Sequence, residues 1–331
     1  MNEDVLQVPA IDIGPFLAGE PDGKRAVVEA VQSACREIGF LVISGHGLPA
    51  EDLAQAFALT RRFFDLPQAE KDRWHPDGPS KQRGYHAFES RGLANTLDSK
   101  VPRDLRETVF LGPVDDFRPH YKDLPEAELS YWPNTIPTEP AGVDAAVIRL
   151  YRGFERLSAD LLRVFALALG MPEDHFADKI DRHFSILSCH HYPALTSPPL
   201  PNQLRTGAHT DFGAMTILAM TEATGGLEVK MPDGHWAGVQ AAADELVVNL
   251  GDMMARWTND RWKSTLHRVV NPPDLKDAMS RRQSIGYFMH PNYDAKIACF
   301  PTCLEPGATP RYPTITAGEH IAMKIEKSHN A

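Results

Sequence analysis

The chain has 331 residues, of which 43% are hydrophobic and 24% are charged, so it can bury a sizeable core. Its formal net charge is −10 and it contains no basic block, which argues against a nucleic-acid partner because binding to phosphates needs clustered Lys and Arg. Four cysteines, at positions 35, 189, 299 and 303, are too few and too irregularly spaced for a secreted disulfide scaffold.

The N-terminus predicts a protein without a targeting signal. Residues 1–15 carry Glu3, Asp4 and Asp12 and lack the apolar stretch of a signal peptide. No run of about 18 apolar residues is present, so no membrane span is expected. We therefore expect a cytoplasmic protein that makes no contact with a membrane.

The N-terminal part of the chain predicts mainly helices, because apolar residues recur there at a spacing of three to four. Residues 77–97 are rich in Gly, Ser, Pro and charge, and the sequence leaves open whether they form a solvent loop or approach a binding site. Residues 115–140 are rich in proline and are expected to form an irregular connector. We expect strands over residues 8–13 and 40–43, and helices over residues 24–38, 49–64 and 67–71.

The C-terminal part changes from one long helix to short strands. Residues 143–169 form the longest helical pattern, which Gly170 ends, and we expect this helix to back a sheet. Many short strands separated by turn signals predict a jelly roll, or double-stranded β-helix, within a mixed α/β (α+β) fold. The strands are expected over residues 186–192, 215–220, 227–230, 245–250, 265–270 and 284–288, followed by an exposed amphipathic helix over residues 317–327.

His209 and Asp211 are the first candidate functional residues. In an extended strand, residues two apart point to the same face, so both side chains can face one ion. His267, from a distant strand, would complete a set of two histidines and one carboxylate, which is typical of non-haem Fe(II) oxygenases. The alternative is a chance tripeptide in a chain with 14 histidines.

Arg282 and Ser284 repeat the same spacing and predict a receptor for a carboxylate, because a guanidinium fork and a hydroxyl on one face suit two carboxylate oxygens. Arg282 precedes an apolar strand, which disfavours the alternative of a surface charge beside Arg281. The adjacent His190 and His191 face opposite ways on a strand, so they cannot easily share one ion, and we expect packing or surface roles for both.

These motifs resemble those of the isopenicillin N synthase-like group of Fe(II)/2-oxoglutarate oxygenases. The similarity covers most of the chain, and residues 225–273 look most like thymine 7-hydroxylase-type members. The matching segments are residues 9–13, 39–43, 45–47 and 63–67 in the N-terminal half, and residues 191–193, 209–213, 225–229, 248–252, 263–269 and 282–284 in the C-terminal half.

The resemblance implies one oxygenase domain over residues 1–331. It would comprise a helical lead-in over residues 1–120, a jelly-roll core over residues 180–292 and a C-terminal helix over residues 315–328. The implied cofactors are Fe(II), with 2-oxoglutarate and O₂ as cosubstrates, and a small molecule would be hydroxylated or desaturated while 2-oxoglutarate becomes succinate and CO₂. The implied ligands are His209, Asp211 and His267 for Fe(II), and Arg282, Ser284 and Tyr192 for 2-oxoglutarate.

The resemblance also implies substrate-facing positions, namely Arg205, Phe212, Phe288 and Asn292. The sequence departs from the family at two relevant places. Ser188 stands where relatives commonly have arginine, and Phe212 stands where thymine-hydroxylating relatives have tyrosine. The resemblance therefore does not imply that thymine itself is the substrate of this chain.

Three alternatives remain open at this point. One is an iron oxidase of the same family that does not use 2-oxoglutarate, and release of succinate and CO₂ would distinguish it. The second is a hydroxylase of thymine-like nucleobases. The third is a non-catalytic jelly-roll protein with a vestigial site, which failure to bind a divalent metal would favour.

Overall fold

The computed structural model describes residues 7–80, 82–92, 102–222, 226–274 and 280–330. Several expected features fall partly outside this range. They are residues 1–6 of the N-terminal segment, residues 81 and 93–97 of the Gly- and Ser-rich segment, and Gly225 of the motif over residues 225–229.

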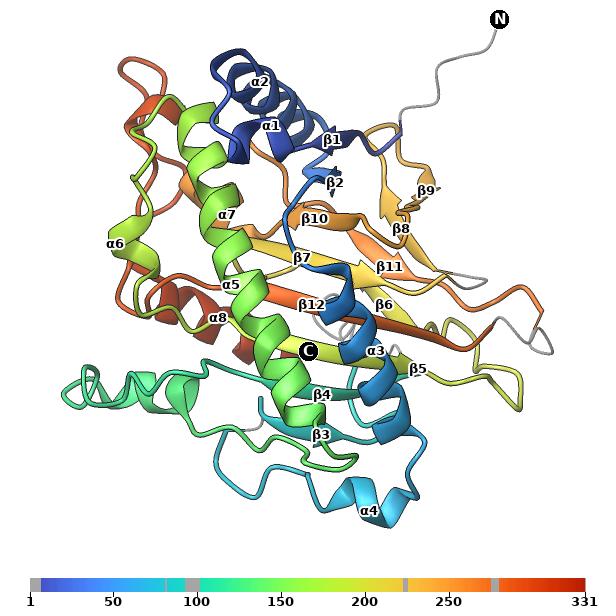
Figure 1. Ribbon diagram of the computed structural model, residues 1–331. Coiled ribbons are helices and arrows are strands. Elements are labelled where there is room, and N and C mark those ends of the chain that lie inside the picture. The colour runs from blue at the N-terminus through green and yellow to red at the C-terminus, as the bar shows by residue number, and fades with distance from the viewer. Residues whose placement is uncertain (1–6, 81, 93–101, 223–225, 275–279, 331) are drawn as a thin grey trace, which may run out of the picture.

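Within the described residues, the largest element is an eight-stranded sheet that runs across the molecule (Figure 1). Its first two strands pair in parallel, and the other neighbours pair antiparallel. In spatial order the strands are β1 (Ala10–Asp12), β2 (Phe40–Ser44), β10 (Leu246–Leu250), β7 (Met215–Met220), β12 (Arg282–Met289), β5 (Ile186–Tyr192), β4 (Glu107–Leu111) and β3 (Gly84–His86).

A smaller antiparallel sheet lies beside the large one, and the space between the two sheets holds a separate hydrophobic cluster that includes Phe40, Tyr192, Val229 and Val269. The described strands of the small sheet are, in order, β6 (Thr206–His209), β11 (His267–Val269), β8 (Leu227–Lys230) and β9 (Trp236–Gly238). A further pair is formed by β13 (Lys296–Ile297) and β14 (Ile315–Thr316).

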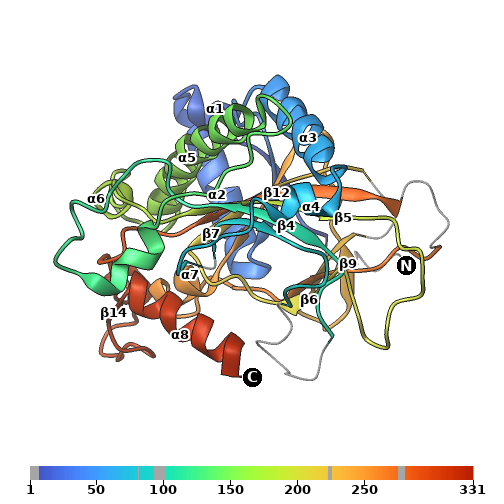
Figure 2. The same ribbon diagram turned by 90° about the horizontal axis from the view of Figure 1, so that it is seen from below.

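The main helices cover one face of the large sheet, as Figure 2 shows for α3 and α5, and α8 lies on the other side. The longest helix packs its apolar stripe on the sheet, where the ring of Tyr287 contacts those of Tyr151 and Phe154. The helices are α1 (Gly14–Leu17), α2 (Pro21–Glu37), α3 (Ala50–Phe64), α4 (Gln68–Asp72), α5 (Val143–Ala168), α6 (Ala177–Ile180), α7 (Asp252–Trp257) and α8 (Ala317–Asn330).

Strand pairing divides β5 and β12 into two faces. Arg282 lies opposite Tyr192, Ser284 opposite His190, and Phe288 opposite Ile186, and directly paired residues share a face. These residues face the space between the sheets. The alternate residues, such as Leu187, Cys189, Ile285 and Tyr287, belong to the core under the helices. The polar face of the large sheet therefore turns toward the interior of the jelly roll.

The structure corrects three expectations. β6 ends at His209, so Asp211 lies beyond the strand, because the chain turns there and the backbone of Asp211 accepts a hydrogen bond from the amide of Asp252. The proline-rich connector contains the 3-10 helix Pro125–Tyr131. The C-terminal helix is not simply exposed, since His320 and Ile321 are buried.

The burial of α5 predicts a large stability cost for Leu161→Ala, because this side chain is fully buried in the main core. Removing a buried leucine side chain costs about 2–5 kcal/mol. Leu200, which is 60% exposed, offers a matched control, and Leu200→Ala should change the free energy of unfolding by less than about 0.5 kcal/mol. Urea unfolding of both variants measures the difference, and equal midpoints would contradict the packing described for α5.

Candidate active site

Three predicted metal-binding side chains meet between the two sheets. His209, at the end of β6, lies opposite His267, at the start of β11. Asp211 follows the end of β6, and its Oδ1 lies 3.6 Å from Nε2 of His209 and 3.7 Å from Nε2 of His267. Within the described residues these are the atoms arranged to hold a metal ion, all within 4.8 Å of one another.

The remaining polar atoms of the three side chains are fixed by hydrogen bonds. Nδ1 of His209 lies 2.8 Å from the carbonyl oxygen of Gly207, and Nδ1 of His267 lies 3.0 Å from that of Thr265. A carbonyl only accepts, so each Nδ1 carries the proton and each Nε2 keeps its lone pair for a metal.

The carboxylate of Asp211 is oriented in the same way. Its Oδ2 accepts hydrogen bonds from Oγ1 of Thr216 at 2.5 Å and from Nδ2 of Asn249 at 2.6 Å. Oδ1 therefore remains directed at the two imidazoles. Thr216 and Asn249 are directly paired on β7 and β10, so the large sheet holds the carboxylate while the small sheet holds the histidines.

Burial and the neighbouring groups shift the pKa values of His209 and Asp211. Burial, helped by the neighbouring His267, lowers the pKa of His209 to about 3, which leaves the imidazole neutral at pH 7. Burial acts to raise the pKa of Asp211, but the two imidazoles and the hydrogen bonds from Asn249 and Thr216 outweigh it and hold the pKa below its usual value. Two neutral imidazoles and one carboxylate are the donor set that suits ferrous iron.

Two glycines let the chain pass close to this cluster. A Cβ on Gly251 would lie 2.9 Å from the carbonyl oxygen of Asp211 and would also clash with that of Gly213. A Cβ on Gly213 would lie 2.6 Å from the carbonyl oxygen of Met289. Real Cβ atoms essentially never come this close to backbone oxygens, so both positions require glycine for the turn after β6 to keep its place.

The predicted carboxylate receptor, Arg282 and Ser284, lies on the face of β12 that turns toward the space between the two sheets. Arg282 is 3% exposed, its guanidinium lies 5.0 Å from the ring centroid of Tyr192, and its Nη1 has no hydrogen-bond partner within the described residues. Burial also lowers the pKa of Arg282. A buried donor without a partner is costly, and the carboxylate of a bound 2-oxoacid would satisfy it.

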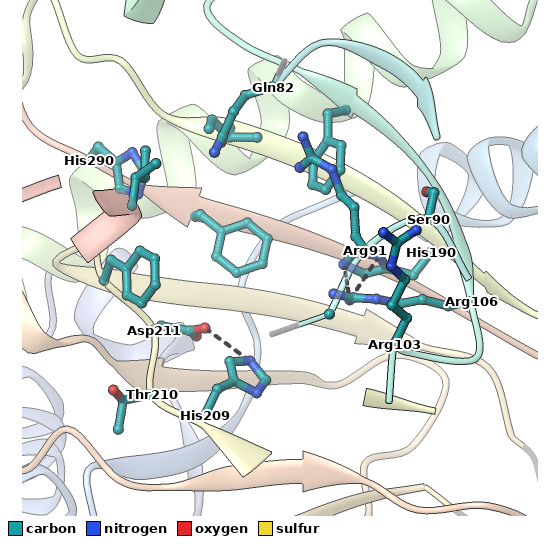
Figure 3. Close-up of a pocket in the computed structure, with 16 residues that line it drawn as sticks. Gln82, Ser90, Arg91, Arg103, Arg106, His190, His209, Thr210, Asp211 and His290 are labelled. Atoms are coloured by element: carbon teal, nitrogen blue, oxygen red, sulfur yellow. Dashed lines mark hydrogen bonds and ion pairs between the residues drawn. The ribbon is translucent and has the colours of Figure 1, made fainter. Parts of the chain in front are cut away.

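A cavity of about 390 Å³ lies beside His209 and Asp211, which belong to its lining (Figure 3), and its volume is in the usual range for small-molecule sites. Phe212 and Phe288, both predicted to face the substrate, line it. His209 and Asp211 also line it. The other described lining residues were not predicted as site residues: they are Gln82, Ser90, Arg91, Gly92, Arg103, Arg106, Phe110, Ile186, His190, Thr210, His290 and Ile325.

The structure places two predicted substrate residues elsewhere. The amide of Asn292 bonds to the backbone of Asp178 and Arg182 and to the carboxylate of Asp181, so this side chain serves the loop before β5 and does not line the cavity. Arg205 is fully buried behind Tyr192, 5.9 Å from its ring centroid, and donates to the carbonyl of Ser280. Arg205 therefore lies on the side of Arg282 and not among the cavity-lining residues.

The two adjacent histidines take different roles, as their strand spacing predicts. His191 stacks on Phe64 outside the jelly roll and contacts Oε1 of Glu107 at 2.7 Å, in agreement with a packing role. His190 turns inward, where it is buried and hydrogen-bonded to Thr108 and Ser188, which is compatible with a packing role, but its place in the cavity lining was not predicted. The signal was present, because His190 is two residues before Tyr192 and must share its face.

This donor set, between the two sheets of a jelly roll, is of the kind found in non-haem iron oxygenases. Residues 183–291 match the family model described as 2OG-Fe(II) oxygenase superfamily. Residues 8–139 match the model described as non-haem dioxygenase in morphine synthesis N-terminal. The chain belongs to the 2OG-Fe(II) oxygenase superfamily.

Curated relatives and solved structures agree with this family assignment. The 2-oxoglutarate-Fe(II) type oxidoreductase hxnY of Emericella nidulans is 31% identical, over 97% of this chain and 90% of hxnY. Proline hydroxylase buaE of Petromyces alliaceus is 32% identical, over 93% of this chain and 94% of its own. A full-length Neurospora crassa protein crystallised with alpha-KG is 28% identical, with a TM-score of 0.85, over 100% of this chain and 98% of its own.

The predicted family, the mixed α/β double-stranded β-helix fold and the dependence on Fe(II) and 2-oxoglutarate are thereby confirmed. The chain is a 2-oxoglutarate-dependent oxidoreductase, which sets aside the non-catalytic alternative. Across the part of the chain that the structure describes, no helix has the length and apolar character needed to cross a membrane.

The close approach at Gly251 predicts that Gly251→Ala weakens metal binding. The new methyl group must displace the backbone of Asp211 or Gly213, so Fe(II) affinity should fall together with the melting temperature, at a cost of about 1–3 kcal/mol in stability. At Gly238 an added Cβ meets no described heavy atom within 4 Å, so Gly238→Ala is the control. Calorimetric Fe(II) titration compares the two, and unchanged affinity in Gly251→Ala would contradict the steric argument.

Proposed function

We propose that His209, Asp211 and His267 hold the Fe(II) of this oxygenase, and that a small molecule is hydroxylated in the adjoining cavity. The observation that carries this proposal is the convergence of two Nε2 atoms and one carboxylate oxygen, with every other polar atom of those side chains already engaged. The bound Fe(II), with 2-oxoglutarate and O₂, supplies the oxidation, and the protein supplies binding and orientation.

We also propose that Arg282, Ser284 and Tyr192 bind the far carboxylate of 2-oxoglutarate. Support comes from the unpartnered Nη1 of Arg282 and from strand pairing, which puts the three side chains on one face. Arg282 would supply the charge and the hydroxyl groups would donate further hydrogen bonds. Arg205, behind Tyr192, would add positive potential to this end of the site.

Phe212 and Phe288 are proposed to contact the substrate, since both line the cavity. A solved complex of the Neurospora crassa relative contains alpha-KG and thymine, so a flat nucleobase remains the alternative substrate class. Hydroxylation is favoured over desaturation because the relative buaE is a proline hydroxylase.

The four cysteines are free thiols, which supports a reducing, cytoplasmic compartment.

The whole chain, residues 1–331, is proposed to act as one oxygenase domain. Support comes from the main hydrophobic core, in which side chains of α2, α3 and α5 pack with those of β5, β7 and β12. The lead-in over residues 1–120 also supplies β2 and β4 to the large sheet.

Asp211→Ala tests the metal site directly. The variant loses the one anionic ligand of the proposed set, so it should retain almost no Fe(II) after dialysis and should release no succinate above background. Asp244→Ala removes an exposed carboxylate that is not part of the cluster and should behave as the unmodified protein. Metal analysis and succinate release are measured for both, and full iron content in Asp211→Ala would refute the assignment.

Arg282→Lys tests the cosubstrate site. Lysine keeps the charge but loses the two-pronged donor, so the affinity for 2-oxoglutarate should fall by roughly ten- to a hundredfold. Arg281→Lys is the matched control, because Arg281 points to the other face of the strand and bonds to His191 and Asp65. Binding is measured by calorimetry with Fe(II) in the absence of O₂, and an equal loss in both variants would show that Arg282 has no special role.

A further inference from the structure

One side of the cavity carries three arginines that neither the iron site nor the 2-oxoglutarate site uses. Figure 3 shows Arg91, Arg103 and Arg106 gathered with His190 on one side of the cavity, away from His290. Among the described lining residues, Asp211 is the one carboxylate, and it faces the proposed metal position. A positive wall in a chain with a net charge of −10 does not follow from overall composition.

Arg106 is built into this wall. It is 9% exposed, its Nη2 lies 3.1 Å from Oδ2 of Asp104, and its Nη1 lies 3.3 Å from Nδ1 of His190. His190 is held in turn by Ser188, whose Oγ lies 2.8 Å from Nε2, and by Thr108, whose Oγ1 lies 2.9 Å from Nδ1. The guanidinium is thus fixed in place before any ligand arrives, which limits the entropy lost on binding.

Arg91 adds a second charge close to the first. Its guanidinium lies 5.1 Å from the ring centroid of Phe110, which also lines the cavity. Burial and the neighbouring Arg106 lower the pKa of Arg91 to about 10, so it remains charged at pH 7 while the two cations repel each other. An anion between them would relieve that repulsion and would accept charge-assisted hydrogen bonds from both.

Much of the remaining lining is apolar, although Gln82, Ser90, Thr210 and His290 also belong to it. Phe110, Ile186, Phe212, Phe288 and Ile325 line the same cavity of about 390 Å³. A ligand that satisfies both kinds of wall has an apolar or aromatic body and an anionic end, and it is small.

We propose that the substrate is a small carboxylic acid whose carboxylate binds Arg91 and Arg106 and whose apolar body extends toward His209 and Asp211. This inference rests on the proposed function, because it names the substrate class of the same site. Asp104 already offsets one of the two positive charges of Arg91 and Arg106, so this pair fits a carboxylate better than a dianionic phosphate. Thymine, which is neutral, would bring no negative charge to this positive wall.

The test compares acids with neutral analogues of the same shape. Dissociation constants of benzoate and phenylacetate, and of benzamide and phenylacetamide, are measured by calorimetry on the full chain with Fe(II) and saturating 2-oxoglutarate, without O₂. Each acid should bind roughly ten- to a hundredfold tighter than its amide, the range expected for hydrogen bonds to a charged group. Equal binding of acid and amide, or no binding of either acid, would overturn the proposal, as would tighter binding of phenyl phosphate than of benzoate.

Two variants assign the preference to the arginines. Arg106→Gln and Arg91→Gln should each reduce the acid-to-amide ratio by roughly tenfold. Arg118→Gln removes the same charge from an exposed pair with Asp116 and should leave the ratio unchanged. Because Arg106 is buried, its variant is first checked for an unchanged melting temperature, and Arg91→Gln decides the matter if Arg106→Gln does not fold. An acid preference that survives Arg91→Gln in full would contradict the proposal.

Different results would refute the substrate class and the proposed function. Fe(II)-dependent succinate release without any acid preference would refute the substrate class and leave the oxygenase assignment intact. An acid preference that is lost in Arg91→Gln, in a protein that neither binds 2-oxoglutarate nor releases succinate, would support the anion site and refute the proposed function.

Discussion

A charged carboxylate buried between two sheets is the constraint on which the site depends. Burial of a charged carboxylate is costly unless hydrogen-bond donors or a cation compensate it. Thr216 and Asn249, on the large sheet, satisfy one oxygen of Asp211, and the other faces the histidines of the small sheet. The carboxylate therefore joins the two layers of the jelly roll. The turn that carries Asp211 packs against the ends of β10 and β12. Gly213 and Gly251 are needed there, because a Cβ at either position would clash with backbone oxygens.

The strands of the jelly roll were largely predictable because their alternation is local. β5, β7 and β8 have the predicted bounds, and the shared face of Arg282 and Ser284 follows from the two-residue period alone. The same reasoning predicted that His209 and Asp211 lie together, as they do, but it assumed a strand through Asp211, and β6 ends at His209. The carboxylate of Asp211 lies beside the histidines because backbone hydrogen bonds from Asp252 and Met253 fix the turn after β6. The two-residue period of a strand cannot predict such contacts.

The substrate side was largely missed, for a different physical reason. Arg106 reaches the cavity because β4 pairs with β5 about 80 residues later in the chain, and no local pattern specifies that partner. Arg205 and Asn292 were chosen by their positions in a family motif, and each proved to be engaged elsewhere. His190 is the exception, because its inward direction follows from its parity with Tyr192 and needed no tertiary information.

The proposed cofactor contacts and the cavity arginines come from different parts of the chain. The proposed iron and 2-oxoglutarate contacts come from residues 192–284, whereas the three cavity arginines come from residues 91–106, outside the jelly-roll strands that carry the metal cluster. With the proposed roles, substitution of these arginines changes the charged group that the cavity holds and leaves the proposed Fe(II) and 2-oxoglutarate ligands in place. The apolar part of the cavity, with Phe212 and Phe288, comes from later in the chain, so charge selection and shape selection of a substrate can vary independently.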